Sequence, residues 1–276
     1  MRVRYVNAGG INTRCIVAGE GPPLLLLHGV GMSADSWIRN IVPLARGRTV
    51  VAVDMLNHGF TDFVSYDGAA PQKKLVEHVL AVADALGYER FSIGGSSFGA
   101  QIATLVHFAA GHRVDNLVIV GSGTSFNTEA ELAVTLPSVL RNALDAYSDP
   151  TWESCRRRME NVVFDPAAVP DEILLSQLTS YARPGMADAY KRTLAGMMDL
   201  DLVRPYRFLE RLEEITVRTF IVWGRQDIRG PVERAIEASR RIPDCRIAVF
   251  ENCGHFPYME HPEDFNAAVD RFLNAS

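Results

Sequence analysis

A serine flanked by glycines is the first residue of this sequence whose surroundings point to chemistry. Ser97 lies in Gly95-Ser96-Ser97-Phe98-Gly99, a G-x-S-x-G pattern between a strand-like apolar run and a helix-like segment. Such a serine occupies a strained strand-to-helix turn, where larger flanking side chains would collide with neighbouring backbone. The pattern predicts that Ser97 is a nucleophile, and the alternative is a glycine turn without a catalytic role.

Two further residues would complete the chemistry of a serine nucleophile. Asp227 follows the apolar run Thr219–Trp223 and a glycine, and His255 follows the run Arg246–Phe250. Both should emerge at the same sheet edge as Ser97, with His255 as general base and Asp227 orienting its imidazole. The chain order serine, aspartate, histidine is typical of hydrolases with this serine turn. Singly these residues are more often structural, but together they predict a catalytic triad.

Backbone amides near Ser97 could stabilise a developing oxyanion. The Phe98 N–H opens a helix, where unpaired amides and the helix dipole favour negative charge. A second N–H is expected from Val30 in His28-Gly29-Val30-Gly31, which follows the first strongly apolar run. We interpret His28 as a histidine that braces this loop.

Other polar residues are weaker candidates for chemistry. Asp199 and Asp201 are the alternatives for the acid, although neither follows a core strand. No dinucleotide fingerprint or metal-ligand spacing occurs, and the cysteines show no pairing pattern, so we expect no cofactor, no metal and reduced thiols. Structural or bystander roles are expected for Asp54, His107, His112, His261 and Cys253.

The elements that must position these residues alternate between strands and helices. Helical spacing in Gln72–Leu86 and Phe98–Ala110, between short apolar runs, predicts a parallel sheet with helices on both faces. The strand-like runs are Leu24–Leu27, Thr49–Val53, Phe91–Ile93, Leu117–Val120, Thr219–Trp223 and Arg246–Phe250.

The alternation breaks between about Ser122 and Ile215, where prolines punctuate helix-like segments without any strand. This predicts an α/β core of residues 1–121 and 216–276, with a helical cap of residues 122–215 inserted after the sixth strand. The cap should lie over the carboxyl edge of the sheet, where open α/β sheets bind ligands.

Composition narrows the class of partner. The 276 residues are 47% hydrophobic and 22% charged, with a net charge of −5 and scattered Lys and Arg. We therefore expect a small neutral or anionic ligand, and neither nucleic acid nor a membrane. The longest apolar run is too short to span a bilayer, and Met1–Arg4 precedes no signal-peptide core, which indicates a cytoplasmic protein.

These motifs, taken in order, resemble the α/β-hydrolase family over nearly the whole chain. Within that family, the cap segment 163–185 and the segment Phe250–Phe265 resemble meta-cleavage product hydrolases, the carbon–carbon bond hydrolases of aromatic-ring degradation. The resemblance implies that the substrate is a ring-cleavage dienoate, a vinylogous 1,5-diketone, and that the serine mechanism needs only water. Many related hydrolases form dimers, so a homodimer is allowed, although no residue indicates an interface. The motifs that carry the resemblance are His28-Gly29, Asp54–Asp62, Gly95–Gly99, Trp223–Asp227 and Gly254-His255.

Three positions depart from the subfamily pattern. Ser96 stands where those enzymes generally have Asn, and Phe256 where they have Trp. Gln177 stands where those enzymes have a cap arginine that holds the dienoate carboxylate. Arg183 follows about one and a half helical turns further on. Together with Gly31, these four residues are expected to contact the substrate. The departures leave open a carboxylesterase or lactonase for small acyl substrates and, more remotely, a ligand receptor of the same fold.

Overall fold

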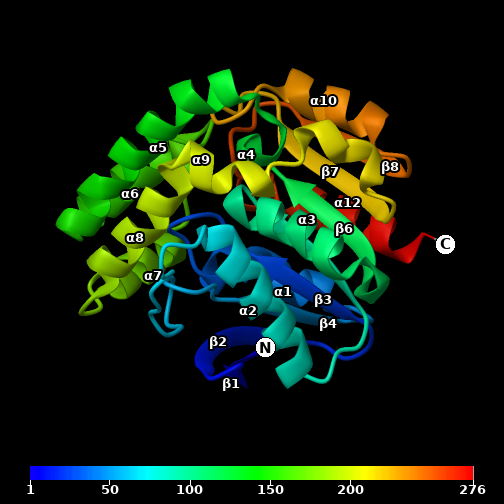
Figure 1. Cartoon of the computed structure of the whole chain (residues 1–276), viewed down its shortest axis with the longest axis horizontal. Coiled ribbons are helices and arrows are strands. Elements are labelled where there is room, and N and C mark those ends of the chain that lie inside the picture. The colour runs from blue at the N-terminus through cyan, green and yellow to red at the C-terminus, as the bar shows by residue number, and fades with distance from the viewer. Residues whose placement is uncertain (276) are drawn as a thin grey trace.

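One eight-stranded sheet forms the centre of the protein, whose computed structural model describes residues 1–275 (Figure 1). The strand order is β1-β2-β4-β3-β5-β6-β7-β8, with β1 and β2 antiparallel and every pairing from β4 to β8 parallel. The strands are β1 (Arg2–Ala8), β2 (Ile11–Ala18), β3 (Pro23–Leu27), β4 (Thr49–Val53), β5 (Phe91–Ser96), β6 (Val114–Val120), β7 (Arg218–Gly224) and β8 (Cys245–Phe250).

All six strand-like runs of the sequence form strands, and two N-terminal strands were not expected. β1 lies at the edge of the sheet, and its first four residues are exposed. Charged side chains alternate with apolar ones there, so β1 shows no continuous apolar run. The parallel strands have both faces covered and are apolar along their length, which makes them visible in the sequence.

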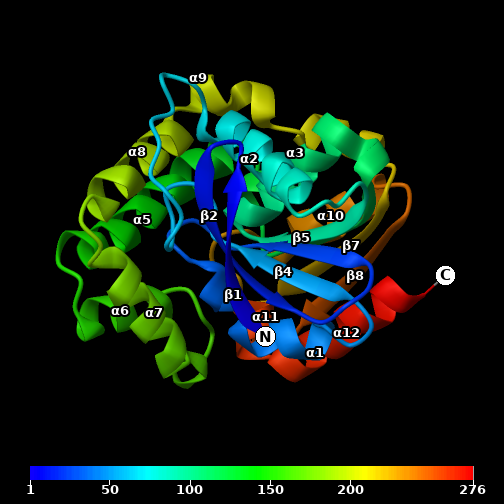
Figure 2. The same ribbon diagram turned by 90° about the horizontal axis from the view of Figure 1, so that it is seen from below.

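Helices cover both faces of the sheet (Figure 2). α2, α3 and α10 pack on one face, and α1, α11 and α12 lie on the other. The core helices are α1 (Ile38–Leu44), α2 (Pro71–Ala85), α3 (Phe98–Ala110), α10 (Val232–Arg241), α11 (Pro257–Glu260) and α12 (Pro262–Asn274), with short 3-10 helices at Ala34–Trp37 and Gly111–Arg113.

A group of helices between β6 and β7 forms the cap, on the left of Figure 1. Its first long helix, α5, begins at a capping box in which Thr128 and Glu131 satisfy each other's backbone amides. The cap helices are α4 (Gly123–Phe126), α5 (Glu129–Ser148), α6 (Trp152–Glu160), α7 (Asp171–Tyr181), α8 (Met186–Met198) and α9 (Leu200–Val203), with 3-10 turns at Pro166–Ala168, Arg204–Tyr206 and Leu209–Glu214. This arrangement confirms the expected fold class, with a helical cap after the sixth strand. No helix in residues 1–275 has the length and apolar composition that crossing a membrane requires.

Three buried histidines make the stability of the fold depend on pH. Burial lowers the pKa of His28 to about 3 and the pKa values of His58 and His78 to about 4, from an ordinary value of 6.5. Below pH 6.5 these three histidines become protonated in the unfolded chain but stay neutral in the folded chain. The free energy of unfolding should therefore fall as pH drops from 6.5 to about 4, with a slope of up to ~4 kcal/mol per pH unit for three such groups. Urea denaturation at several pH values measures this slope.

His78 offers a variant that isolates one of these contributions, because it does not line the cavity that contains Ser97. Its Nε2 is 2.7 Å from Thr13 Oγ1 at the α2–β2 contact. His78→Leu keeps an apolar side chain in this buried place and removes one titrating group. The slope between pH 6 and 5 should decrease by about 1.4 kcal/mol per pH unit, and an unchanged slope would contradict the assignment.

Candidate active site

The turn between β5 and α3 holds Ser97 in a strained conformation. Its φ of 55° and ψ of −121° lie outside the regions that non-glycine residues normally adopt. A Cβ at Gly95 would overlap the backbone of Gly99, and one at Gly99 would overlap the carbonyl of His28. The two glycines are therefore required by close backbone packing. The Ser97 amide donates to Val120 O at 2.8 Å, and Ser122 Oγ donates to Ser97 O at 2.7 Å, which fixes the turn on β6.

Asp227 and His255 meet in a buried pair beside this turn. His255 Nδ1 lies 2.9 Å from both carboxylate oxygens of Asp227. The Asp227 carboxylate also accepts the Arg229 backbone N–H at 2.8 Å, so it is held on two sides. A carboxylate on Nδ1 keeps the proton on that nitrogen and leaves Nε2 as the basic atom. The arrangement can therefore support a histidine that accepts a proton at Nε2.

The loop that carries His255 is held by Glu260, a residue not identified from the sequence. Its carboxylate accepts the backbone N–H groups of Gly254, Phe256 and Phe164 at 2.7–3.1 Å. The His255 N–H itself donates to Val162 O of the cap at 2.9 Å. The histidine loop is thus fixed to the cap as well as to the core, and Glu260 is a positioning residue.

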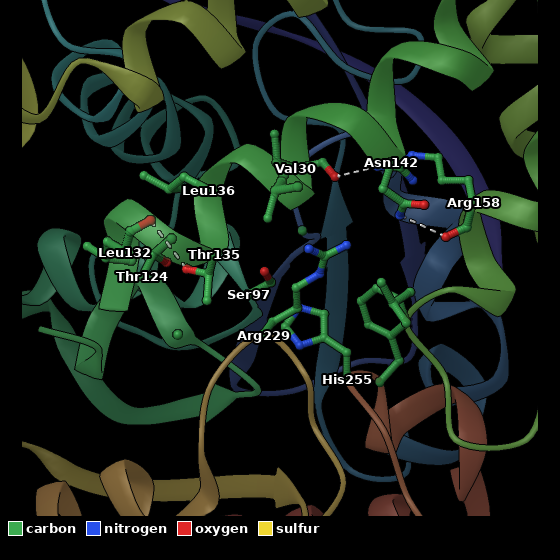
Figure 3. A pocket seen from close by; sticks show the side chains of 15 residues that line it. Val30, Ser97, Thr124, Leu132, Thr135, Leu136, Asn142, Arg158, Arg229 and His255 are labelled. Atoms are coloured by element: carbon green, nitrogen blue, oxygen red, sulfur yellow. Dashed lines mark hydrogen bonds between the residues drawn. The ribbon is translucent and has the colours of Figure 1, made fainter. Parts of the chain in front are cut away.

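Ser97 and His255 line one narrow cavity of about 60 Å³ between core and cap (Figure 3). We call it the inner cavity. Its core side holds the Gly29–Val30 loop and Ser97, and its cap side holds residues of α4, α5 and α6. The full lining is Gly29, Val30, Ser97, Gly123, Thr124, Leu132, Thr135, Leu136, Val139, Asn142, Arg158, Val162, Arg229, His255 and Phe256.

The loop after β3 lies directly against the turn that carries Ser97. A Cβ at Gly29 would lie 3.3 Å from the Ser97 Cβ, so only glycine allows this approach without adjustment. Val30 follows it in the inner cavity wall, and Phe98 is the first residue of α3, where the amide has no partner within the helix. These are the two amides expected to face an oxyanion.

Two buried side chains fix this loop from behind. His28 Nδ1 lies 2.8 Å from Gly29 O, and the Met55 N–H donates to its Nε2 at 3.0 Å. Both nitrogens of a neutral imidazole are therefore used, in keeping with a bracing role. Asp54 accepts the amides of Ala34 and Phe60 at 2.6 and 2.7 Å and pairs with Arg14, which is also a structural arrangement.

Two arginines enter the inner cavity that sequence reasoning did not identify. Arg158 of α6 is only 8% exposed and donates to Val30 O at 3.1 Å, while its Nε has no hydrogen-bond partner in residues 1–275. Arg229, in the loop after β7, donates to Ser138 Oγ at 2.5 Å. Neither guanidinium forms an ion pair with a carboxylate of the described chain. Burial, together with repulsion from Arg158, lowers the pKa of Arg229, yet an arginine remains charged at neutral pH.

The structure places Gln177 and Arg183, two of the residues expected to contact substrate, outside the inner cavity. Gln177 of α7 is 3% exposed, lies outside the inner cavity, and donates to the sulfur atoms of Met32 and Met159 at 3.1 and 3.0 Å. Arg183 donates to the carbonyls of Gly59 and Thr61 and lies over the Phe63 ring at 4.6 Å. The Gln177 Nε2 and the Arg183 guanidinium are thus used in contacts away from the inner cavity, and Gln177 Oε1 has no hydrogen-bond partner in residues 1–275. Arg158 also contacts Met32 but, unlike Gln177, lines the inner cavity together with Ser97.

The other three residues expected to contact substrate are divided between the inner cavity and its surroundings. Phe256 lines the inner cavity and packs against His255, with ring centroids 4.8 Å apart. Ser96 is fully buried at the end of β5 and is not part of the lining. Gly31, with a φ of 72°, lies behind the lining, where a Cβ would collide with Arg158 and Tyr190.

The alternative acids lie elsewhere in the cap. The Asp199 side chain accepts the Leu202 N–H at 3.0 Å and caps α9, and Asp201 pairs with Arg204 at 2.8 Å. Neither lines the inner cavity, so Asp227 is the carboxylate in contact with His255.

Comparison with known proteins identifies the family. A model of the alpha/beta hydrolase family matches residues 24–268. A 2-hydroxy-6-oxononadienedioate/2-hydroxy-6-oxononatrienedioate hydrolase of Paraburkholderia xenovorans is 31% identical, covering 93% of this chain and 88% of that protein. A 2-hydroxy-6-oxo-2,4-heptadienoate hydrolase of Pseudomonas putida is 30% identical, covering 99% and 96%.

Solved structures agree with this assignment. The structure of a meta-cleavage product hydrolase from Pseudomonas fluorescens superimposes with a TM-score of 0.79 at 28% identity, covering 98% of this chain and 97% of that one. Since the family model spans most of the sequence and these relatives match it almost end to end, the chain belongs to the alpha/beta hydrolase family and is similar within it to meta-cleavage product hydrolases.

Proposed function

We propose that this hydrolase cleaves a carbon–carbon bond of a ring-cleavage dienoate, with Ser97 as nucleophile, His255 as general base and Asp227 as the orienting acid. The buried Asp227–His255 pair and the strained serine in the same cavity support the triad. The relatives above are hydrolases of 2-hydroxy-6-oxo dienoates, which supports this class of substrate.

The reaction would begin with a proton transfer that prepares the dienoate. His255 assists the conversion of the dienol to its keto form, and Ser97 then attacks the distal ketone as its proton passes to His255 Nε2. The amides of Val30 and Phe98 stabilise the oxyanion. The carbon–carbon bond breaks, the leaving carbon takes the proton from His255, and water hydrolyses the acyl-enzyme to a carboxylic acid.

The two unpaired arginines of the inner cavity are the observation that carries the choice of substrate. A buried guanidinium without a counter-ion is costly, and a carboxylate is the ligand that compensates it best. A dienoate brings at least one carboxylate, whereas a neutral ester brings none. Arg158 and Arg229 therefore take the place that the sequence assigned to Gln177 and Arg183.

Turnover of a yellow dienoate and of a neutral short-chain 4-nitrophenyl ester tests this proposal. In Arg229→Met, kcat/KM for the dienoate should fall about 100-fold, mainly through KM, because a charge contact within the inner cavity is lost. For the ester, which carries no carboxylate, kcat/KM should change by less than about threefold. Arg225→Met is the matched control, since Arg225 is an exposed arginine of the same loop that pairs with Glu251 at 2.9 Å.

The two substrates also separate the alternative functions. Ester cleavage without dienoate turnover would identify a carboxylesterase or lactonase and reject carbon–carbon hydrolysis. Negligible turnover of both, with tight binding of a ligand, would favour a receptor of the same fold.

A further inference from the structure

A second cavity lies on the outer side of the inner cavity, between α5, α6 and the loop after β7. Its volume is about 340 Å³, against about 60 Å³ for the inner cavity. Five of its lining residues are exposed, whereas no residue of the inner lining is, so this outer cavity opens to solvent. The outer cavity is lined by Ser138, Arg141, Asn142, Asp145, Ser154, Arg157, Arg158, Asn161, Ile228 and Arg229.

Three side chains, Asn142, Arg158 and Arg229, line both cavities and form the wall between them. Asn142 donates to Arg158 O at 3.0 Å and accepts from Asn161 at 2.8 Å. Arg158 is anchored to Val30 O, whereas within residues 1–275 the Arg229 guanidinium forms one hydrogen bond, to the neutral Ser138 hydroxyl. Arg229 thus has fewer side-chain hydrogen bonds than Asn142 or Arg158.

The outer cavity is strongly basic in a protein whose net charge is −5. Four arginines line it, and Asp145 is the one carboxylate among its lining residues. Arg141 and Arg157 form no ion pair within residues 1–275. Arg156, the neighbour of Arg157 on α6, instead pairs with Asp171 at 2.8 Å and does not line the cavity. Unpaired cations at the mouth of a cleft raise the local concentration of anions.

We infer that the outer cavity is the entrance for carboxylate-bearing substrates, which Arg141 and Arg157 attract and which pass the wall when Arg229 leaves Ser138. The carboxylate then exchanges the outer arginines for Arg158 and Arg229, beside Ser97. Positive charge is continuous along this path, so an anion does not have to cross an uncompensated apolar region. The inference rests on the proposed function in taking Ser97 as the nucleophile.

A pair of esters that differ in one charge tests the entrance without requiring carbon–carbon cleavage. The pair is mono-(4-nitrophenyl) glutarate, which ends in a carboxylate, and neutral 4-nitrophenyl pentanoate. In Arg141→Gln/Arg157→Gln, kcat/KM for the anionic ester should fall about tenfold at low salt, and its salt dependence should weaken. Arg156→Gln is the matched control, and it should leave the ratio of kcat/KM for the two esters unchanged. An unchanged ratio in the double variant would overturn the inference.

A bulky group at the same place separates an entrance from a distant electrostatic effect. Arg141→Cys carrying a large uncharged maleimide should hydrolyse both esters at least about fivefold more slowly than wild type, because the path is obstructed. The unlabelled variant should hydrolyse only the anionic ester more slowly. Labelled wild type controls for the native thiols, of which Cys15, Cys155 and Cys253 are buried. Full activity of the labelled variant toward both esters would exclude this route.

Calorimetric titration with hexanoate supplies a readout that does not depend on turnover. The double variant should bind hexanoate at least about threefold more weakly than wild type, because two attracting charges are lost. Equal affinity would reject the anion-attracting role. If neither ester is hydrolysed by the wild type, the proposed nucleophile fails, whereas this titration still decides the role of the outer arginines.

Discussion

Ser97→Ala should reduce kcat for the dienoate by about 10⁴-fold or more, because removing a serine nucleophile leaves only the oxyanion site and substrate binding. The variant should remain folded, since alanine tolerates the turn no worse than serine and the Ser97 amide and carbonyl keep their bonds to Val120 and Ser122. Steady-state absorbance of the dienoate measures the loss, and thermal unfolding checks the fold.

A covalent probe gives the same prediction an independent readout. A fluorophosphonate should label the wild type and fail to label Ser97→Ala. Ser92→Ala is the matched control, because Ser92 lies at the other end of β5, where its hydroxyl accepts from Asn116 at 3.0 Å. Undiminished turnover in Ser97→Ala would reject the serine mechanism, whatever the substrate.

Asp227→Asn should lower kcat by about 10⁴-fold, by analogy with other triads in which an amide favours the wrong histidine tautomer. An asparagine at this position can donate its amide N–H to Nδ1, which places the imidazole proton on Nε2, the atom that would have to accept the Ser97 proton. Stopped-flow or steady-state turnover at pH 7 measures the effect. The amide remains close in size to the carboxylate, so the protein should stay folded.

The cap aspartates supply the controls for this substitution. Asp199→Asn and Asp201→Asn change carboxylates that cap α9 and pair with Arg204, and both should retain nearly full activity. A large loss of kcat in either variant, with Asp227→Asn near wild type, would transfer the acid role to the cap.

Local sequence signals predicted the fold class because its strands are buried on both faces. Each of the six apolar runs singled out in the sequence became a parallel strand, and the proline-punctuated interval became the helical cap. β1 was missed because an exposed edge strand carries no such run. The nearness of Asp227 and His255 was also predictable, because both follow neighbouring parallel strands whose carboxyl ends share one edge.

The side chains that we propose to bind the substrate carboxylate could not be assigned in this way. The resemblance of the cap segment to meta-cleavage product hydrolases pointed to Gln177 and Arg183. In the structure, the Gln177 amide contacts methionine sulfurs and the Arg183 guanidinium contacts backbone carbonyls of the core. Arg158, the last of three consecutive arginines, carried no sequence signal that distinguished it from Arg156 and Arg157. Which of the three lines the inner cavity depends on the rotation of α6 against α5 and the core.

The sequence by itself determined the six parallel strands, the place of the cap and the candidate residues Ser97, Asp227 and His255, because short-range apolar periodicity and strand-end position encode them. Only the tertiary structure decided which cap side chains share the inner cavity with Ser97 and that a basic outer cavity adjoins it. Helix packing angles and long side chains set those contacts, and they arise from interactions between segments far apart in the chain.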